Sequence, residues 1–132
     1  MRPIEFRFWS PQGKAFVQDY KYNGFVEDLF AQDKFLIPQQ YTGIKDKKDK
    51  KVFEGDFVQF KPEKDQKVLA VVAWGEEAGG FQLVCQDSKQ TVHARFNMLY
   101  CKEGKVIGNI LQNDQLIYVS EEYFEQYKEK PL

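Results

Sequence analysis

The acidic pair in Glu54-Gly55-Asp56 is the first place to look for chemistry in this chain. Two carboxylates separated by one residue lie on the same side of a strand, where they could hold a metal ion or act as acid and base. A glycine between two acids just before a strand is also typical of a turn, in which the aspartate accepts backbone N–H groups. A metal site would need further Asp, Glu or His ligands, which the sequence cannot supply here. The sequence therefore favours a structural turn and predicts no metal ligand.

Nucleophilic catalysis has little support in the sequence. His93 is the only histidine, and no Ser or Cys stands at a motif position beside it. Cys85 and His93 could meet in space, but so could many other pairs. The glycine-rich segment 75–80 lacks the Gly-Lys-Ser/Thr ending of a phosphate-binding loop. We therefore expect no catalytic residue, no cofactor and no enzymatic activity.

A lysine-rich segment and two separate side chains are candidates for contact with a nucleic acid or a protein partner. Residues 45–51, KDKKDKK, contain five lysines that could contact a phosphate backbone. An aromatic residue beside the glycine-rich turn could stack on a base, as in small barrels that bind single strands. The candidate contacts are Lys45, Lys47, Lys48, Trp74 and Arg95.

Each of these candidates also has an ordinary structural explanation. The aspartates in 45–51 weaken the positive field, so the segment could be a solvated loop that protects a sheet edge. Trp74 could pack on Phe81 as a cross-strand partner. The formal net charge is −1 and the pI about 5.9, without the basic excess that is usual in duplex-DNA binders. A nucleic-acid role would therefore require a local basic face.

Aromatic residues near the start of the chain predict a contact between copies of the protein. Phe6, Phe8 and Trp9 give the first strand a large apolar surface. The sequence does not say whether that surface covers the chain's own barrel or a neighbouring copy. A two-stranded element with so much apolar area is a plausible oligomer contact, so we expect a homo-oligomer.

Cysteine usage and hydropathy predict a soluble protein of the cytoplasm. Cys85 and Cys101 stand in apolar surroundings without metal-ligand spacing, which favours buried thiols over a disulfide. Whether the two lie near each other is open. The first residues lack the apolar run of a signal peptide, and no segment reaches the ~20 apolar residues of a membrane span. We expect no membrane partner.

The elements that would position these residues are mostly strands. Alternating apolar residues and the turn Ser10–Gly13 predict a β-hairpin over the first twenty residues. Residues 18–40 predict a linking segment with at most a short helix, ended by Pro38. The run 68–74, VLAVVAW, is apolar enough for a strand covered on both faces. Residues 92–99 fit a strand or a short helix.

The end of the chain predicts a short helix with Ser120 as its N-cap, or else a frayed tail. Short strands with glycine turns predict a small, twisted, SH3-like or otherwise partly open β-barrel. The expected class is therefore mostly β (α+β). The expected divisions are a hairpin and linker over 1–40, a barrel over 41–119 and a helix or tail over 120–132.

The central block of the chain resembles a known family. Tyr41-Thr42-Gly43-Ile44-Lys45-Asp46 followed by Phe53-Glu54-Gly55-Asp56-Phe57-Val58 is similar to the central signature of the YopX family. The opening residues 2–9 and the later segments 72–74 and 106–110 resemble other parts of the same family. Ile44 replaces the usual Leu, and Phe53 stands where Tyr is commoner.

The resemblance implies a β-rich fold, an origin in a bacteriophage or prophage and self-association. It implies no catalytic residues. We therefore expect a phage-derived, non-enzymatic binding or assembly module that acts in the bacterial cytoplasm on a phage or host protein. The alternative is a small-barrel protein that binds nucleic acid.

Overall fold

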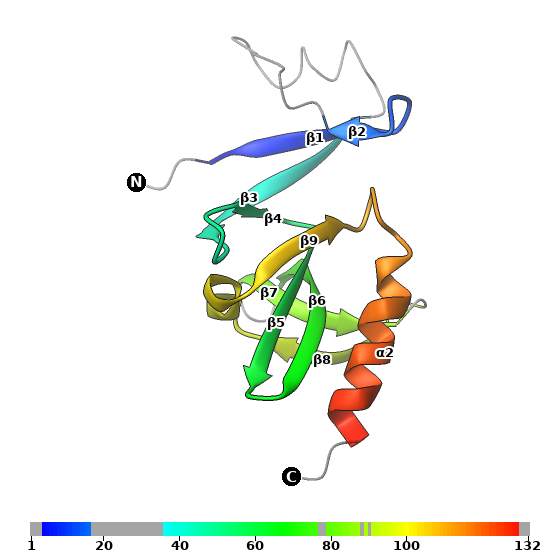
Figure 1. Cartoon of the computed structure of the whole chain (residues 1–132). Helices are drawn as coiled ribbons and strands as arrows, with labels where there is room; N and C mark the ends of the chain where they lie inside the picture. Colours follow the sequence, from blue (N-terminus) through cyan, green and yellow to red (C-terminus); the bar gives the residue numbers. More distant parts are fainter. Residues whose placement is uncertain (1–3, 17–35, 77–78, 88, 90, 130–132) are drawn as a thin grey trace. The chain divides into compact units, whose positions relative to one another are not determined.

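The chain forms two structural units, residues 1–41 and 42–132, in a computed structural model. The described residues are 4–16, 36–76, 79–87, 89 and 91–129, and side chains are described as far as residue 122 (Figure 1). Residues 17–35, which include most of the predicted linking segment 18–40, lie outside the described residues. Strands dominate both units, which confirms the predicted mostly β class.

The first unit contains the predicted hairpin. Strands β1 (Phe6–Ser10) and β2 (Ala15–Phe16) pair antiparallel, with Trp9 opposite Phe16. In the turn between them, the Gly13 N–H donates to Ser10 Oγ at 3.1 Å. A short polar side chain that accepts a nearby backbone N–H is what favours serine at this position.

The structure corrects the end of the predicted linking segment. Strand β3 (Ile37–Lys45) already begins before Pro38, which lies opposite Phe8 of β1. A proline can lie in a strand wherever its missing N–H is not needed by the hydrogen-bond ladder. The strand also continues through Thr42 and Gly43. The sheet order is β2-β1-β3-β4, and the boundary between the units falls within β3.

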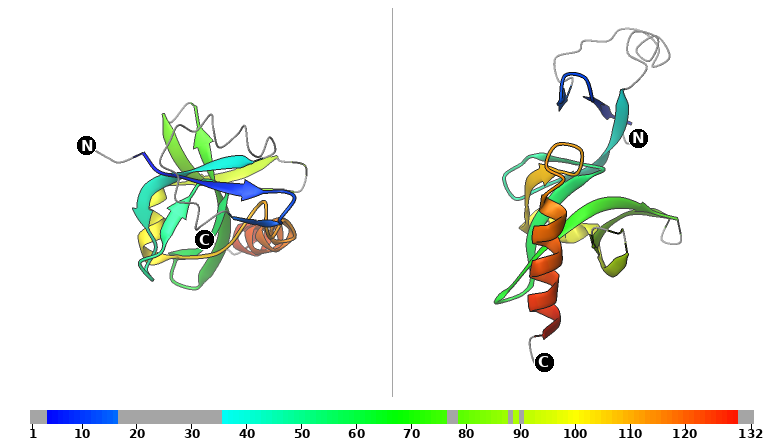
Figure 2. Two further views of the ribbon diagram at one scale, coloured as in Figure 1. Left: turned by 90° about the horizontal axis from the view of Figure 1, so that it is seen from above. Right: turned by 90° about the vertical axis from the view of Figure 1, so that its right-hand side faces the viewer.

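The second unit is built on a curled, partly open sheet of strands in the order β8-β7-β6-β5-β9 (Figures 1 and 2). Its strands are β5 (Asp56–Glu63), β6 (Gln66–Gly75), β7 (Gly80–Gln86), β8 (Val92–Phe96) and β9 (Lys105–Asn109). A short strand, β4 (Lys51–Phe53), precedes them. The register shifts in β5 after Phe57 and after Phe60, and in β7 after Cys85. Such irregularities bend a strand and increase its twist, which lets a short sheet curl.

Both faces of the curled sheet are covered, as the apolar run 68–74 predicts. One face holds a core that includes Val68, Val72 and Leu83, closed by Met98 and Cys101 of the 3₁₀ helix η1 (Met98–Glu103). Residues 92–99 therefore form a strand and then the start of a helix, so both alternatives hold for part of the segment.

The other face of the sheet packs under helix α2 (Leu116–Glu129), which lies against β6 and β7 (Figure 1). Phe57, Leu69, Val71 and Val84 of the strands form this second core. Three residues of the helix pack on it: Leu116, Ile117 and Val119.

The predicted helix start at Ser120 is wrong. Helix α2 begins at Leu116, and the Leu116 N–H donates to the Asn113 carbonyl at 2.9 Å. Ser120 is only 1% exposed, and its hydroxyl donates to the Leu69 carbonyl. Local cap chemistry indicated a start at the serine, but burial of the apolar residues before it extends the helix. No helix in the described residues is long and apolar enough to cross a membrane.

Candidate functional site

Asp56, the second acid of the sequence-predicted pair, is part of the internal structure. Its side chain is 1% exposed, and Oδ2 accepts the Phe53 N–H at 2.8 Å. Oδ1 accepts Asn109 Nδ2 at 2.9 Å, which ties the corner to the end of β9. Gly55 has a φ of 85°, a conformation that suits glycine, and its carbonyl accepts the Ile110 N–H at 2.8 Å. The acid therefore fixes a corner, as the turn interpretation predicts.

Asp46 holds the lysine-rich loop in a similar way. Its side chain is 6% exposed, and Oδ1 accepts the N–H groups of Lys48 and Lys50 at 2.8 and 3.0 Å. Oδ2 accepts the Val106 N–H at 2.9 Å, 60 residues along the chain. Burial opposes ionisation of Asp46, but these backbone hydrogen bonds and the nearby Lys50 charge outweigh it and hold the pKa of the carboxyl below its ordinary value.

The two thiols are buried and free. Cys85 and Cys101 belong to the same core cluster and are 1% and 0% exposed. Burial raises the pKa of each thiol to about 12, and the negative charges of Asp46 and Asp56 add to the rise at Cys101. A thiol that stays protonated at neutral pH is a poor nucleophile.

His93 is exposed near the start of β8, next to the turn that joins β7 to β8. Its Nε2 is 3.3 Å from Asp87 Oδ2. The other oxygen of Asp87 accepts the N–H groups of Lys89 and Thr91, both at 2.9 Å. The Thr91 hydrogen bond is the main reason why the pKa of Asp87 lies below its ordinary value. The pair closes a turn, and among the described residues no group of three His, Cys, Asp or Glu side chains is placed to hold a metal ion.

Two of the sequence-predicted contact residues share one surface depression. Trp74 of β6 and Arg95 of β8 line a hollow of about 360 Å³. Gln82 and Gln86 of β7 also line it, and Glu76 is the one acid among its described lining residues. We call this the aromatic hollow. Although the Trp74 ring packs edge-on against Phe81 at 5.1 Å, as the core interpretation predicts, Trp74 remains 53% exposed. Part of the indole is therefore a cross-strand partner of Phe81, and the rest is open to solvent.

The lysine-rich loop contributes to a different depression. Lys47 lines a second hollow of about 350 Å³ together with Lys61, Lys67 and Lys105. Gln59, Phe60 and Glu103 complete the lining, and we call this depression the lysine groove. In contrast, Lys45 lies 3.7 Å from Asp49, and Lys48 is exposed on the loop. Lys45 and Lys48 do not line either hollow.

Three of the lysines that line the groove were not identified from the sequence. Lys61 and Lys67 flank the turn between β5 and β6, and Lys105 begins β9 opposite Gln59. Lys61 and Lys67 bound a polar segment between two apolar runs, and antiparallel pairing of those runs is the signal that could have brought the two lysines together. No local signal connects them to Lys47 or Lys105.

The aromatic residues proposed for oligomer contact lie on β1 of the first unit. Phe6 is 44% exposed and Phe8 is half-buried, whereas Trp9 is 7% exposed and packs edge-on against Phe16 at 4.9 Å. The Arg7 guanidinium lies 4.0 Å above the Phe16 ring, and Arg7 also donates to Gln39 Oε1. Of the three candidates, Phe6 therefore offers the largest exposed surface.

Comparison with known proteins identifies a family and finds similar solved structures. The family model described as YopX protein matches residues 10–118. The crystal structure of protein EF1440 from Enterococcus faecalis aligns with 89% of this chain and 99% of its own, at a TM-score of 0.58 and 22% identity. Likeness at that identity shows a shared fold. No curated protein sequence matches this chain.

Proposed function

This chain belongs to the YopX family, and from that premise we propose that it is a non-enzymatic binding module whose second unit binds single-stranded nucleic acid at the aromatic hollow. The proposal includes a phage or prophage origin and action in the cytoplasm of the bacterial host cell, which the family resemblance implies. The structural role of the two buried aspartates in the family signature supports a function without catalysis. Asp46 and Asp56 accept backbone or amide hydrogens inside the fold, in positions where they are shielded from a substrate.

The observation that carries the proposal is that Trp74 and Arg95 line one open hollow. An exposed indole can stack on any base, and an arginine beside it can bind a phosphate or stack in turn. The amides of Gln82 and Gln86 on the same lining can hydrogen-bond to base edges. A stacking surface, a cation and neutral amides together suit a single strand, because its unpaired bases are accessible for stacking and hydrogen bonding.

Binding of a fluorescent single-stranded oligonucleotide, followed by anisotropy at low salt, tests this function. Trp74→Ser and Arg95→Gln should each weaken binding, and the indole fluorescence of Trp74 should fall when the wild type is titrated. Leu99→Ser is the matched control, since Leu99 is 58% exposed and lies outside the hollow. No binding by the wild type at low salt, or an equal loss in Leu99→Ser, would remove the proposal.

Self-association is a second candidate function, favoured by the exposure of the first strand. Ile4 is 75% and Phe6 44% exposed, two residues apart on a segment that pairs with β3. Light scattering at several concentrations should show a mass that rises in the wild type and less so in Phe6→Ser. A strictly monomeric mass across the micromolar range would rule it out.

A further inference from the structure

The lysine groove concentrates positive charge on a protein that is slightly acidic as a whole. Four lysines and one glutamate line it, a local charge of +3, whereas the whole chain carries −1. The lysines come from a loop and three strands, and only the folded unit brings Lys47 and Lys105 to the neighbouring pair Lys61 and Lys67. All four are exposed, so their charged ends remain in water. This is the local basic face that the composition of the chain conceals.

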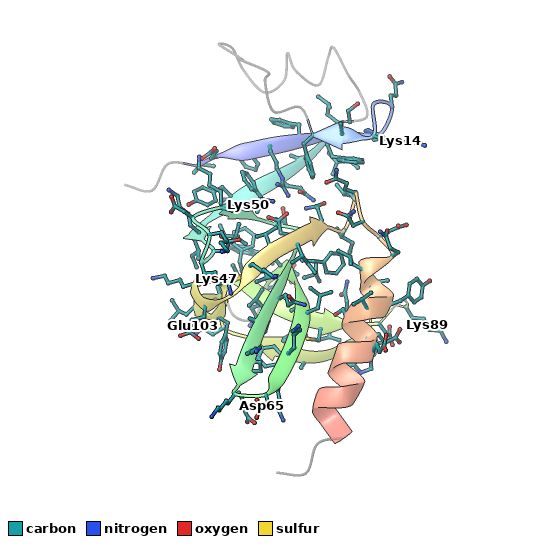
Figure 3. The ribbon with its side chains drawn as sticks, in the orientation of Figure 1. Lys14, Lys47, Lys50, Asp65, Lys89 and Glu103 are labelled. Carbon is teal, nitrogen blue, oxygen red and sulfur yellow. The ribbon has the colours of Figure 1, made fainter. Side chains whose placement is uncertain are left out.

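The fold holds two sides of this groove in place. The Lys47 N–H donates to the Gly104 carbonyl at 3.0 Å, and Asp46 accepts the Val106 N–H from the other side of Lys105. The loop that carries Lys47 is therefore fixed to the start of β9, beside Lys105 and Glu103. Figure 3 shows Lys47 and Glu103 close to each other, on the opposite side of this unit from Lys89.

Gly104 brings the start of β9 close to Gln59 and Phe60 of β5, two residues that line the groove. A Cβ at this position would lie 2.6 Å from the Gln59 carbonyl oxygen and 3.0 Å from Phe60 Cβ. Only a glycine allows this approach without a shift of the backbone. Lys105 then lies directly opposite Gln59, two positions before Lys61 on β5. The cations are thus arranged by backbone contacts before any ligand arrives.

The chemistry of the lining indicates which part of a ligand it would contact. Lysines are flexible point charges, suited to phosphate oxygens rather than to the paired hydrogen bonds by which arginine reads a base. The aromatic ring in the lining, Phe60, is 2% exposed and offers no surface for stacking. The groove is therefore built to contact a chain of negative charges and not the bases.

We propose that the lysine groove is a second site of the protein, one that binds the phosphate backbone of nucleic acid without regard to sequence. Asp46 and Gly104 act as positioning residues, because they hold the loop and β9 that carry Lys47 and Lys105. The site is distinct from the aromatic hollow, since the two share no lining residue. It can therefore operate whether or not Trp74 stacks on a base.

A labelled DNA duplex isolates this site, since its bases are paired and stacked away from Trp74. Binding should weaken as salt rises, with a slope in log K of about −0.9 for each phosphate contact. The double variant Lys61→Gln/Lys67→Gln should lower duplex affinity on the order of 10-fold at 0.1 M salt and reduce the slope by about 2. Substitution of all four lysines by glutamine should reduce the salt slope by up to about 4. Trp74→Ser should leave duplex binding intact.

The double variant Lys14→Gln/Lys89→Gln is the matched control, because it removes the same charge from residues outside the groove. An equal loss in this control, or an unchanged slope in the groove variants, would overturn the proposal. Binding to vesicles rich in anionic lipid without any binding to the duplex would also overturn it, in favour of a membrane surface. Duplex binding that depends on the groove while Trp74→Ser has no effect on single strands would sustain this inference and refute the proposed function of the hollow.

Discussion

The second unit contains two kinds of charged residue. The aspartates of the family signature are buried, whereas the cations that line the two hollows are exposed. Asp46 and Asp56 are buried, and their oxygens accept N–H groups from distant parts of the second unit. Lys61, Lys105 and Arg95 are exposed on strands and line the two depressions. A buried carboxylate with several donors stabilises a fold, whereas an exposed cation in a depression is available to a ligand. The most recognisable residues of this chain are therefore not the ones best placed to bind.

The largest change in stability is expected from the loss of a buried aspartate of the family signature. Asp56→Ala removes the acceptor of the Phe53 N–H and of Asn109 Nδ2 in a fully buried corner. We expect a loss of about 3 kcal/mol in the free energy of unfolding, measured by urea denaturation, because buried donors lose their partners. Asp49→Asn, at a side chain that is 85% exposed, is the control and should change stability by less than about 0.5 kcal/mol. Equal effects of the two substitutions would contradict a structural role for Asp56.

Gly104 is itself buried, but it contacts Gln59 and Phe60, which line the lysine groove. Gly104→Ala places a Cβ 2.6 Å from a backbone oxygen that cannot move aside easily. We expect a loss of about 1–3 kcal/mol in the free energy of unfolding, together with weaker duplex binding. Gly80→Ala meets no atom within 4 Å and should be close to neutral. A Gly104→Ala protein of wild-type stability and affinity would show that the close approach has no consequence.

The third prediction concerns the pH dependence that Asp46 confers. Its pKa is lowered in the folded protein, so the stabilisation is present above the unfolded value of about 3.9 and is lost as pH falls through the folded pKa. Asp46→Asn should cost about 1–2 kcal/mol at pH 7, from weaker hydrogen bonds to the loop and to Val106. The difference in the free energy of unfolding between the wild type and Asp46→Asn should narrow as pH is lowered from about 5 towards 2.

Asp87 also has a lowered pKa, so the wild type and Asp46→Asn both lose stability in the same acid range. Only the difference between their free energies of unfolding in urea therefore reports on Asp46. A gap that stays constant with pH would contradict a role for the ionised carboxylate.

The smallest effect on stability is expected at the aromatic hollow. Trp74 is 53% exposed, so Trp74→Ser should lower the free energy of unfolding by at most about 1 kcal/mol. The same substitution should weaken single-strand binding by about 1–3 kcal/mol, the range of one base–aromatic stack. A large loss of stability without a loss of binding would place Trp74 with the structural residues and reverse the contrast.

Much of the local structure was predictable because it depends on neighbouring residues. Period-two alternation identified β1 and the apolar run indicated β6, and turn residues located the first hairpin and the corner at Gly55. Prediction failed where distant contacts override local chemistry. Ser120 looks like a cap, but packing of Leu116 and Ile117 under the sheet begins the helix earlier. Pro38 looks like an end, but pairing with β1 makes it part of β3.

The candidate sites divide along the same line. From the sequence alone, Trp74, Arg95 and Lys47 were recognisable as residue types that suit nucleic acid, and the corner role of Asp56 followed from the glycine beside it. Only the tertiary structure decided that Trp74 and Arg95 share a hollow, and that Lys47 lies with Lys61, Lys67 and Lys105 instead. The reason is that residue type and turn chemistry are properties of short segments. Which side chains meet depends on strand order, on register shifts in β5 and on one close backbone approach at Gly104, and no short segment specifies these.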